Sequence, residues 1–139
     1  MTTAYLALRW DNLTLLFPQA ELTSVESILD VRLDDTAHPD EVNGWLWAYE
    51  QDWPLYSLDV RLYRQTQTPP QRRICALFAA TGLALACEAV IPITQPLTPV
   101  PLPDSLRLPH SPLTGVARWE QHLALVTDST RLAAWLAHA

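Results

Sequence analysis

Short apolar runs separated by two-residue polar gaps are the feature that most limits how this chain can fold. Asp11-Asn12 fills one such gap near the N-terminus, and Glu120-Gln121 fills another near the C-terminus. The flanking runs are AYLALRW (4–10), LTLLFP (13–18), LTGVARW (113–119) and HLALVTD (122–128). Alternating or fully apolar runs joined in this way predict β-hairpins. Hairpins spread along a chain predict an all-β barrel or sandwich, not a parallel sheet with crossover helices.

The two cysteines lie in another predicted hairpin. The segment RRICALFAATGLALACEAV predicts two strands that meet at Thr81-Gly82. A turn centred on Thr81 sets Cys75 opposite Cys87. Two cysteines are too few for a disulfide framework and lack a C-x-x-C spacing, so we expect two buried thiols packed across the strands.

Seven of the twelve prolines fall between residues 92 and 112. Proline removes backbone donors, so this stretch fits neither a helix nor a central strand. We expect an extended connector over the domain surface; a proline-rich ligand for aromatic grooves of other proteins is the alternative. After the last hairpin, Asp128 can cap a short terminal helix in which Leu132, Trp135 and Leu136 share one face.

The composition is that of a packed domain. The chain has 139 residues, of which 49% are hydrophobic and 17% charged, and this excludes disorder caused by weak apolar content. The length suits one domain spanning residues 1–139. Because no apolar run is long enough for a membrane helix and the N-terminus lacks a signal-peptide pattern, we expect a cytoplasmic protein without membrane insertion.

The charge is negative and uneven. The formal net charge is −6, with nine arginines and no lysine. This disfavours nucleic acid as a partner, because counterion release needs a basic face. Residues 21–59 hold ten acids and one base. Such a field either steers association with a basic partner or is a solvated acidic face that maintains solubility.

No set of residues in the sequence predicts catalysis. Ser57, Asp59 and His122 supply the atoms of a hydrolytic triad, but no G-x-S-x-G motif surrounds the serine. The four histidines lack metal-binding spacing, and the three glycines form no phosphate-binding loop. We therefore expect a protein that is not an enzyme and binds no metal and no cofactor.

The tryptophans gather in a central segment. NGWLWAYEQDWPLYSLDVRL predicts a hairpin with its turn near residues 50–52. Because a strand alternates its faces, Trp45, Trp47 and Tyr49 share one face, opposite an aliphatic one. Either this aromatic stripe is partly exposed and anchors an interface, or it completes a two-sided core.

Four motifs along the chain resemble, in order, those of one known family. YLALRWDNLTLLFPQAELTSV resembles its opening hairpin and GWLWAYEQDWPLYSLDVRL its central block. LALACEAV is similar to its G-L-L-V-D-x-V strand, and SPLTGVARWEQHLALVTDSTRL to its closing G-V-A and D-x-x-x-L element. The family is the CheW-like domain, the adaptor of bacterial chemosensory arrays. The residues to which these motifs and the predicted turns assign a structural role are Pro18, Gly44, Pro54, Gly82, Gly115 and Asp128.

The resemblance implies a fold and a function. The fold is a pair of interwoven five-stranded β-barrels of the SH3 type, here followed by a short C-terminal helix. Members of the family have no catalytic residues, and they bridge a CheA-type histidine kinase and chemoreceptor tips. This sequence departs from the family where partners are contacted. Tyr49 stands at the receptor-contacting arginine, Glu50 at a glycine, and Ser57 at the usual aspartate.

Two hypotheses follow. The first is a non-enzymatic adaptor whose partners are a CheA-type kinase, a chemoreceptor or another chemosensory protein. Its diverged contact surface includes the acid-rich side from Glu21 to Asp52, and the residues expected to bind the partner are Trp45, Trp47, Tyr49, Glu50, Asp52 and Trp53. The second is a small-molecule sensor or binding module in which tryptophans line an apolar pocket of the same fold. Neither hypothesis fixes the oligomeric state.

Overall fold

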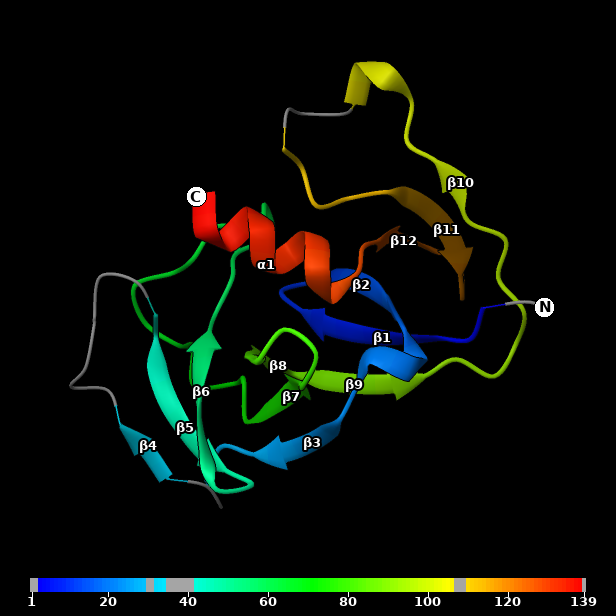
Figure 1. Cartoon of the computed structure of the whole chain (residues 1–139). Helices are drawn as coiled ribbons and strands as arrows, with labels where there is room; N and C mark the ends of the chain where they lie inside the picture. The colour runs from blue at the N-terminus through cyan, green and yellow to red at the C-terminus, as the bar shows by residue number, and fades with distance from the viewer. Residues whose placement is uncertain (1–2, 30–31, 35–41, 107–109, 139) are drawn as a thin grey trace.

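Two β-sheets and one terminal helix make up the protein (Figure 1). The computed structural model describes residues 3–29, 32–34, 42–106 and 110–138. The chain starts in the first sheet, crosses to the second and then returns to the first, so the two sheets are interwoven. The all-β architecture with two interwoven halves and a short C-terminal helix is therefore confirmed.

The first sheet has six strands in the order β10-β11-β12-β2-β1-β9. Neighbouring strands are antiparallel except β12 and β2, which run parallel. Its strands are β1 (Tyr5–Trp10), β2 (Leu13–Pro18), β9 (Ala89–Pro92), β10 (Val100–Pro101), β11 (Gly115–Trp119) and β12 (His122–Val126).

The second sheet also has six strands, in the order β3-β7-β8-β6-β5-β4, with β6 and β8 parallel. Its strands are β3 (Ser24–Ser27), β4 (Arg32–Asp34), β5 (Gly44–Ala48), β6 (Gln51–Tyr56), β7 (Ile74–Phe78) and β8 (Leu83–Cys87). The short edge strands β10 and β4 bring each sheet to six strands where five were expected.

Among the described residues, three helical segments complete the fold: the 3-10 turns η1 (Gln19–Glu21) and η2 (Asp104–Leu106), and the helix α1 (Ser129–His138). In the part of the chain that the structure describes, none of these is long and apolar enough to span a membrane. The helix begins after Asp128, whose Oδ1 accepts the backbone N–H of Arg131 at 2.7 Å. This is the expected N-cap, which satisfies a donor left open by the first turn.

Three buried clusters hold the sheets together. The central cluster joins the first sheet, the second sheet and α1, and it contains Trp10, Phe17, Phe78 and Leu132. The Phe17 and Phe78 rings meet across the sheets with centroids 4.8 Å apart. Each of the other two clusters packs on the face of one sheet that is turned away from the central cluster, and we call these two the outer clusters. Because strand residues alternate in direction, β2 and β7 supply residues to the central cluster and to an outer one.

Three hairpins close with two-residue turns in which both residues have positive φ. This is the conformation of the type I′ turn, whose twist matches that of the strands. The turns predicted at Asp11-Asn12 and Glu120-Gln121 are confirmed. The middle turn is formed by residues 49–50 rather than 50–52, because Ala48 pairs with Gln51. Tyr49 therefore belongs to the turn and not to the strand in which it was expected.

The cysteine hairpin differs from its predicted register. Cys75 pairs with Ala86 and Cys87 with Ile74, because four residues separate Phe78 from its partner Leu83, whereas the predicted register has five between Phe78 and Ala84. A loop with an even number of residues shifts the strand pairing by one residue relative to the predicted loop. A shift of one residue exchanges the side chains that face each other across the strands. Both thiols are buried and free, as expected, but they lie in different clusters and the predicted packing of one against the other is wrong.

The glycines and the proline-rich segment have structural roles. Gly82 has a φ of +71° in the turn between β7 and β8, and a Cβ at Gly115 would lie 2.7 Å from the carbonyl oxygen of Val100. Gly115 therefore lets β10 approach β11. In the described part of residues 92–112 the helical turn η2 is the one helical segment, and Ile93 and Leu97 pack into the outer cluster of the first sheet. The segment is a packed connector.

The middle turn provides a stability prediction. Glu50 has a φ of 61°, which costs an L-residue free energy that glycine avoids. We expect Glu50→Gly to raise the free energy of unfolding by about 0.5–1 kcal/mol in urea titrations. Asp52→Gly, in the adjacent strand, is the matched control and should lower it. A destabilised Glu50→Gly protein would contradict the assigned turn geometry.

Candidate functional site

The three residues considered for hydrolysis have separate structural roles. Ser57 is buried, and its Oγ lies 2.6 Å from Oγ1 of Thr68. Asp59 accepts two backbone N–H groups of its own loop, and His122 begins β12 in the first sheet. Across the described residues, no group of three or more His, Cys, Asp or Glu side chains could hold a metal ion.

The β5–β6 hairpin presents two different faces. Leu46, Trp53 and Leu55 point inward and belong to the outer cluster of the second sheet. The Trp53 indole Nε1–H donates to the carbonyl oxygen of Ala48 at 2.9 Å, which fixes the ring inside the hairpin. The opposite face carries the pairs Trp47–Asp52 and Trp45–Pro54; we call these four residues the hairpin face. The aliphatic side faces the core and Trp47 is exposed, which is the first of the two arrangements that the sequence left open.

The exposure of the six predicted contact residues separates them into two groups. Trp47 is 50% exposed and Tyr49 61% exposed. Glu50 and Asp52 are also exposed, and Trp45 is half-buried. Trp53 is only 2% exposed and cannot anchor a partner on the folded protein, so the prediction that it is a contact residue is wrong. It shares the inward face with Leu46, since the two are cross-strand partners.

Tyr49 connects the hairpin turn to β3. Its hydroxyl donates to Oε1 of Glu26 at 2.8 Å, and Ser24 Oγ donates to the same oxygen at 3.2 Å. β3 and β5 lie near opposite ends of the strand order, so this contact shows that the second sheet curls until its ends approach one another. On the lower side of Figure 1, β3 and the β5–β6 turn therefore lie side by side.

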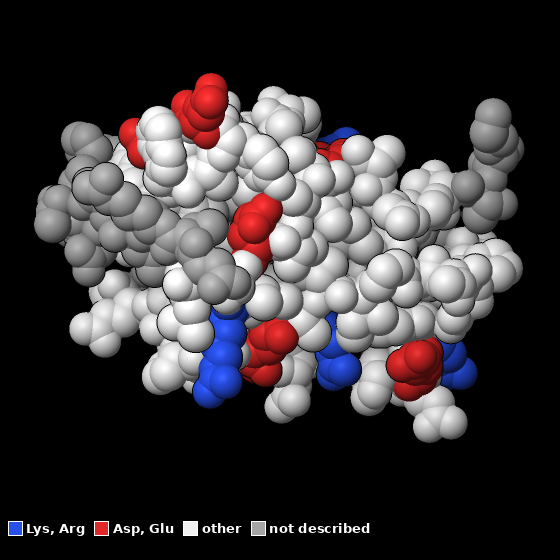
Figure 2. Space-filling model, turned by 90° about the horizontal axis from the view of Figure 1, so that it is seen from below, with Lys and Arg blue, Asp and Glu red and all other residues white. Residues whose placement is uncertain are grey.

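The expected acidic surface is only partly available. Glu21 Oε1 accepts the backbone N–H of Ser129 at 2.8 Å and so stabilises the start of α1. Glu26 and Asp59 are engaged in the contacts given above. Figure 2 shows the lower side with acids and arginines standing singly or next to one another on a mainly uncharged surface. Asp30, Asp35, Asp40 and Glu41 lie outside the described residues.

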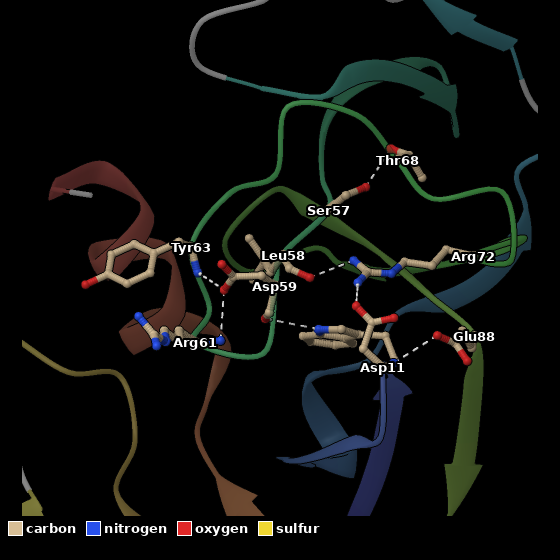
Figure 3. Close-up of polar contacts among 10 residues, drawn as sticks. Asp11, Ser57, Leu58, Asp59, Arg61, Tyr63, Thr68, Arg72 and Glu88 are labelled. Atoms are coloured by element: carbon tan, nitrogen blue, oxygen red, sulfur yellow. Dashed lines mark hydrogen bonds and ion pairs between the residues drawn. The ribbon is translucent and has the colours of Figure 1, made fainter.

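The junction between the sheets depends on a residue that the sequence analysis did not identify. The Arg72 side chain is fully buried. Its Nη2 lies 2.7 Å from Oδ2 of Asp11 in the first hairpin, and its Nη1 donates to the carbonyl oxygen of Leu58 at 2.7 Å (Figure 3). The guanidinium also lies 5.6 Å from the centre of the Trp10 ring. A buried charge needs such compensation, because desolvation costs several kcal/mol.

Neighbouring contacts extend this junction. The backbone N–H of Asp11 donates to Oε2 of Glu88 at 2.9 Å, and the Trp10 indole donates to the carbonyl oxygen of Asp59 at 3.2 Å. Beyond Asp59, the Trp135 indole of α1 donates to the carbonyl oxygen of Leu62 at 2.7 Å. The junction thus links the first hairpin, the segment after β6, and the terminal helix. No local sequence pattern predicts it, because its main partners are 14 and 61 residues from Arg72.

A pocket of about 640 Å³ opens beside the start of β5. Its walls include Ile28, Leu29, Leu55, Thr68 and Arg73, and its lining in the described chain contains no aromatic residue. The second hypothesis expected a pocket lined by tryptophans. The pocket that forms here differs because Trp53 is enclosed in the hairpin core while Trp47 lies on the opposite face of the hairpin.

The sheet junction makes a prediction about charge. Asp11→Asn keeps a residue that tolerates positive φ and removes the counter-charge of Arg72. We expect the free energy of unfolding to fall by about 2–3 kcal/mol, below the range for fully buried pairs because the Asp11 side chain is 33% exposed. Asp128→Asn, which removes the charge from the exposed pair with Arg131, should cost less than about 0.5 kcal/mol. Equal losses in urea titrations would argue against the junction.

The buried thiols make a prediction about pH. Burial raises the pKa of Cys75 to about 11 and that of Cys87 to about 12, from an ordinary value of 9.0. At a pH between the ordinary value of 9.0 and about 11, the folded protein therefore keeps both thiol protons, whereas the unfolded chain loses them. Their stabilising contribution should be complete below about pH 9 and be lost as the pH rises through 11–12. Native protein at pH 8 should react with a thiol reagent only as fast as it unfolds; rapid labelling would refute this.

Comparison with known proteins reveals similarity in structure. No family model matches the sequence, and no curated protein matches it. Among solved structures, the scaffolding protein TtCheW from Thermoanaerobacter tengcongensis is similar, with a TM-score of 0.71 at 13% sequence identity. The match covers 91% of this chain and 89% of that one. The protein described here has a CheW-like fold.

Proposed function

We propose that residues 1–139 form one non-enzymatic CheW-like adaptor that couples a CheA-type histidine kinase to chemoreceptor-like partners. The β5–β6 hairpin is its contact surface, through Trp47, Tyr49, Glu50 and Asp52, with Trp45 at the margin. As an adaptor of this kind the protein acts in the cytoplasm. It binds neither nucleic acid nor a cofactor.

The observation that carries this proposal is the exposure of two large aromatic side chains on a CheW-like fold. Tryptophan and tyrosine are the residues most enriched at the energetic centres of protein interfaces. Trp47 and Tyr49 are at least half exposed, whereas Trp53 and Trp10 have their indole N–H groups bonded to backbone carbonyls. The resemblance in sequence supports the same location, because it puts Tyr49 at the receptor-contacting position.

The rigidity of the hairpin also supports a binding role. Leu46 and Trp53 anchor it from within, and the bond between Tyr49 and Glu26 holds its turn. A surface displayed on packed strands loses little conformational entropy when a partner binds. The exposed side chains can also be changed without removing any residue from the core, which makes the proposal testable.

The small-molecule hypothesis has less support. A volume of about 640 Å³ is within the range of ligand pockets. However, Asn43 in its wall is engaged in bonds to Gln65 and Ser57, and Thr68 is bonded to Ser57. These two polar side chains of the wall therefore hold the fold itself.

Binding to purified partners tests the proposal. The partners are the regulatory domain of a CheA-type kinase and a chemoreceptor signalling tip encoded in the same genome. We expect Trp47→Ser, Tyr49→Ala and Glu50→Arg each to weaken binding about tenfold or more in calorimetry. The melting temperature of Trp47→Ser should stay near that of the wild type, since the indole is half exposed.

Leu123→Ser is the control variant. Leu123 is 72% exposed and lies on β12 in the first sheet, so its replacement tests whether any exposed apolar side chain matters. It should leave binding unchanged. If the wild-type protein binds neither partner, the adaptor function is wrong; if Leu123→Ser alone weakens binding, the contact surface is wrong.

A further inference from the structure

In the part of the chain that the structure describes, the hairpin face carries an indole N–H without a hydrogen-bond acceptor beside a carboxylate without an ion pair. Trp47 and Asp52 are cross-strand partners, so their Cβ atoms are about 4.5–5.5 Å apart on the same side of the sheet. Both side chains are exposed. Within the described residues, neither the Trp47 indole N–H nor the Asp52 carboxylate has a hydrogen bond or an ion pair.

The charge around this pair is negative. No lysine or arginine occurs between residues 41 and 60, and Glu50 in the adjacent turn is exposed and unpaired in the described part of the chain. β4 places Arg32 and Asp34 at the register positions opposite Trp47 and Trp45. One arginine and three acids therefore stand on β4 and the hairpin, which leaves a net charge of −2.

An aromatic face next to a carboxylate suits one type of side chain best. A guanidinium is planar, stacks on an indole, and donates two N–H groups to a carboxylate at the same time. A lysine ammonium can make the ion pair but stacks less well and is more strongly hydrated. An acidic side chain would be repelled by Asp52 and Glu50. Arg72 over Trp10 shows the same combination inside this protein, with Asp11 as the carboxylate.

We propose that the hairpin face binds an arginine of a partner protein, stacked on the Trp47 indole and paired with the Asp52 carboxylate. Glu50 adds attraction from the turn. The inference rests on the proposed adaptor function, and it specifies that the partner surface is basic where it meets β5 and β6. Charge complementarity is the argument for this occupant, and a second copy of the chain, which has nine arginines of its own, is an outcome that the test separates.

Nuclear magnetic resonance can test the arginine preference without the natural partner. The probe is a short peptide with three arginines, and its control has citrulline, which keeps the shape of arginine and lacks the charge. The indole N–H signal of Trp47 is assigned with Trp47→Phe. We expect the arginine peptide to shift this signal saturably, the citrulline peptide to shift it several-fold less, and Asp52→Asn to abolish the difference. Equal shifts with both peptides would overturn the inference.

The same spectra distinguish a second copy from another protein. If the Trp47 signal shifts with the concentration of the wild-type protein alone, and the shift disappears in Asp52→Arg, the arginine comes from another copy of this chain and the heterologous partner is refuted. A signal that is independent of protein concentration supports a different protein as the source.

Charge reversal then tests the natural complex. Asp52→Arg should weaken binding of the kinase domain or the receptor tip at least tenfold, whereas Glu120→Arg, in the exposed turn of the last hairpin, should change it less than twofold. Exchanging the contacted partner arginine for glutamate should restore binding to Asp52→Arg. Unchanged binding by Asp52→Arg refutes the inference and leaves the adaptor function intact. Failure of the wild type to bind either partner while the arginine peptide still shifts Trp47 refutes only the adaptor function.

Discussion

The buried guanidinium of Arg72 is the contact on which the arrangement of the two sheets depends. It belongs to the loop before β7, yet its counter-charge comes from Asp11 in the hairpin of the first sheet. Its second bond fixes Leu58, just beyond the end of β6. A buried charge without a partner is strongly unfavourable, so packings that separate these groups are disfavoured even where apolar burial is similar. The orientation of β6 relative to the first sheet follows from this requirement.

The position of the proposed contact surface depends on that junction. β6 runs from the hairpin turn to the segment held by Arg72, so the hairpin is fixed at one end by the buried charge and at the other by the bond between Tyr49 and Glu26. Trp53 fills the interior between these points. Trp47 is therefore displayed on a rigid support, which is the condition under which an exposed aromatic side chain contributes most to binding.

Much of the fold could be predicted from local patterns, because turn residues and period-two alternation are local properties. The turn at Asp11-Asn12 and the helix cap at Asp128 belong to this class. Errors arose where an interaction decided between neighbouring registers. The cysteine hairpin has an even loop that its sequence does not specify. Arg72 could not be foreseen, because its partners are brought together only by the packing of the sheets.

The candidate site was predictable to a similar extent. Alternation correctly separated the exposed Trp47 from the buried Leu46. The inclusion of Trp53 in the contact surface was wrong, because the turn reverses the chain direction and Trp53 pairs with Leu46 on the inward face. The measurement that tests the central claim most directly is photo-crosslinking in the native cell, with a photoreactive amino acid at position 47 or at position 123. We expect crosslinks to a chemosensory kinase or receptor from position 47 and none from position 123. The reverse pattern would contradict the proposed contact surface.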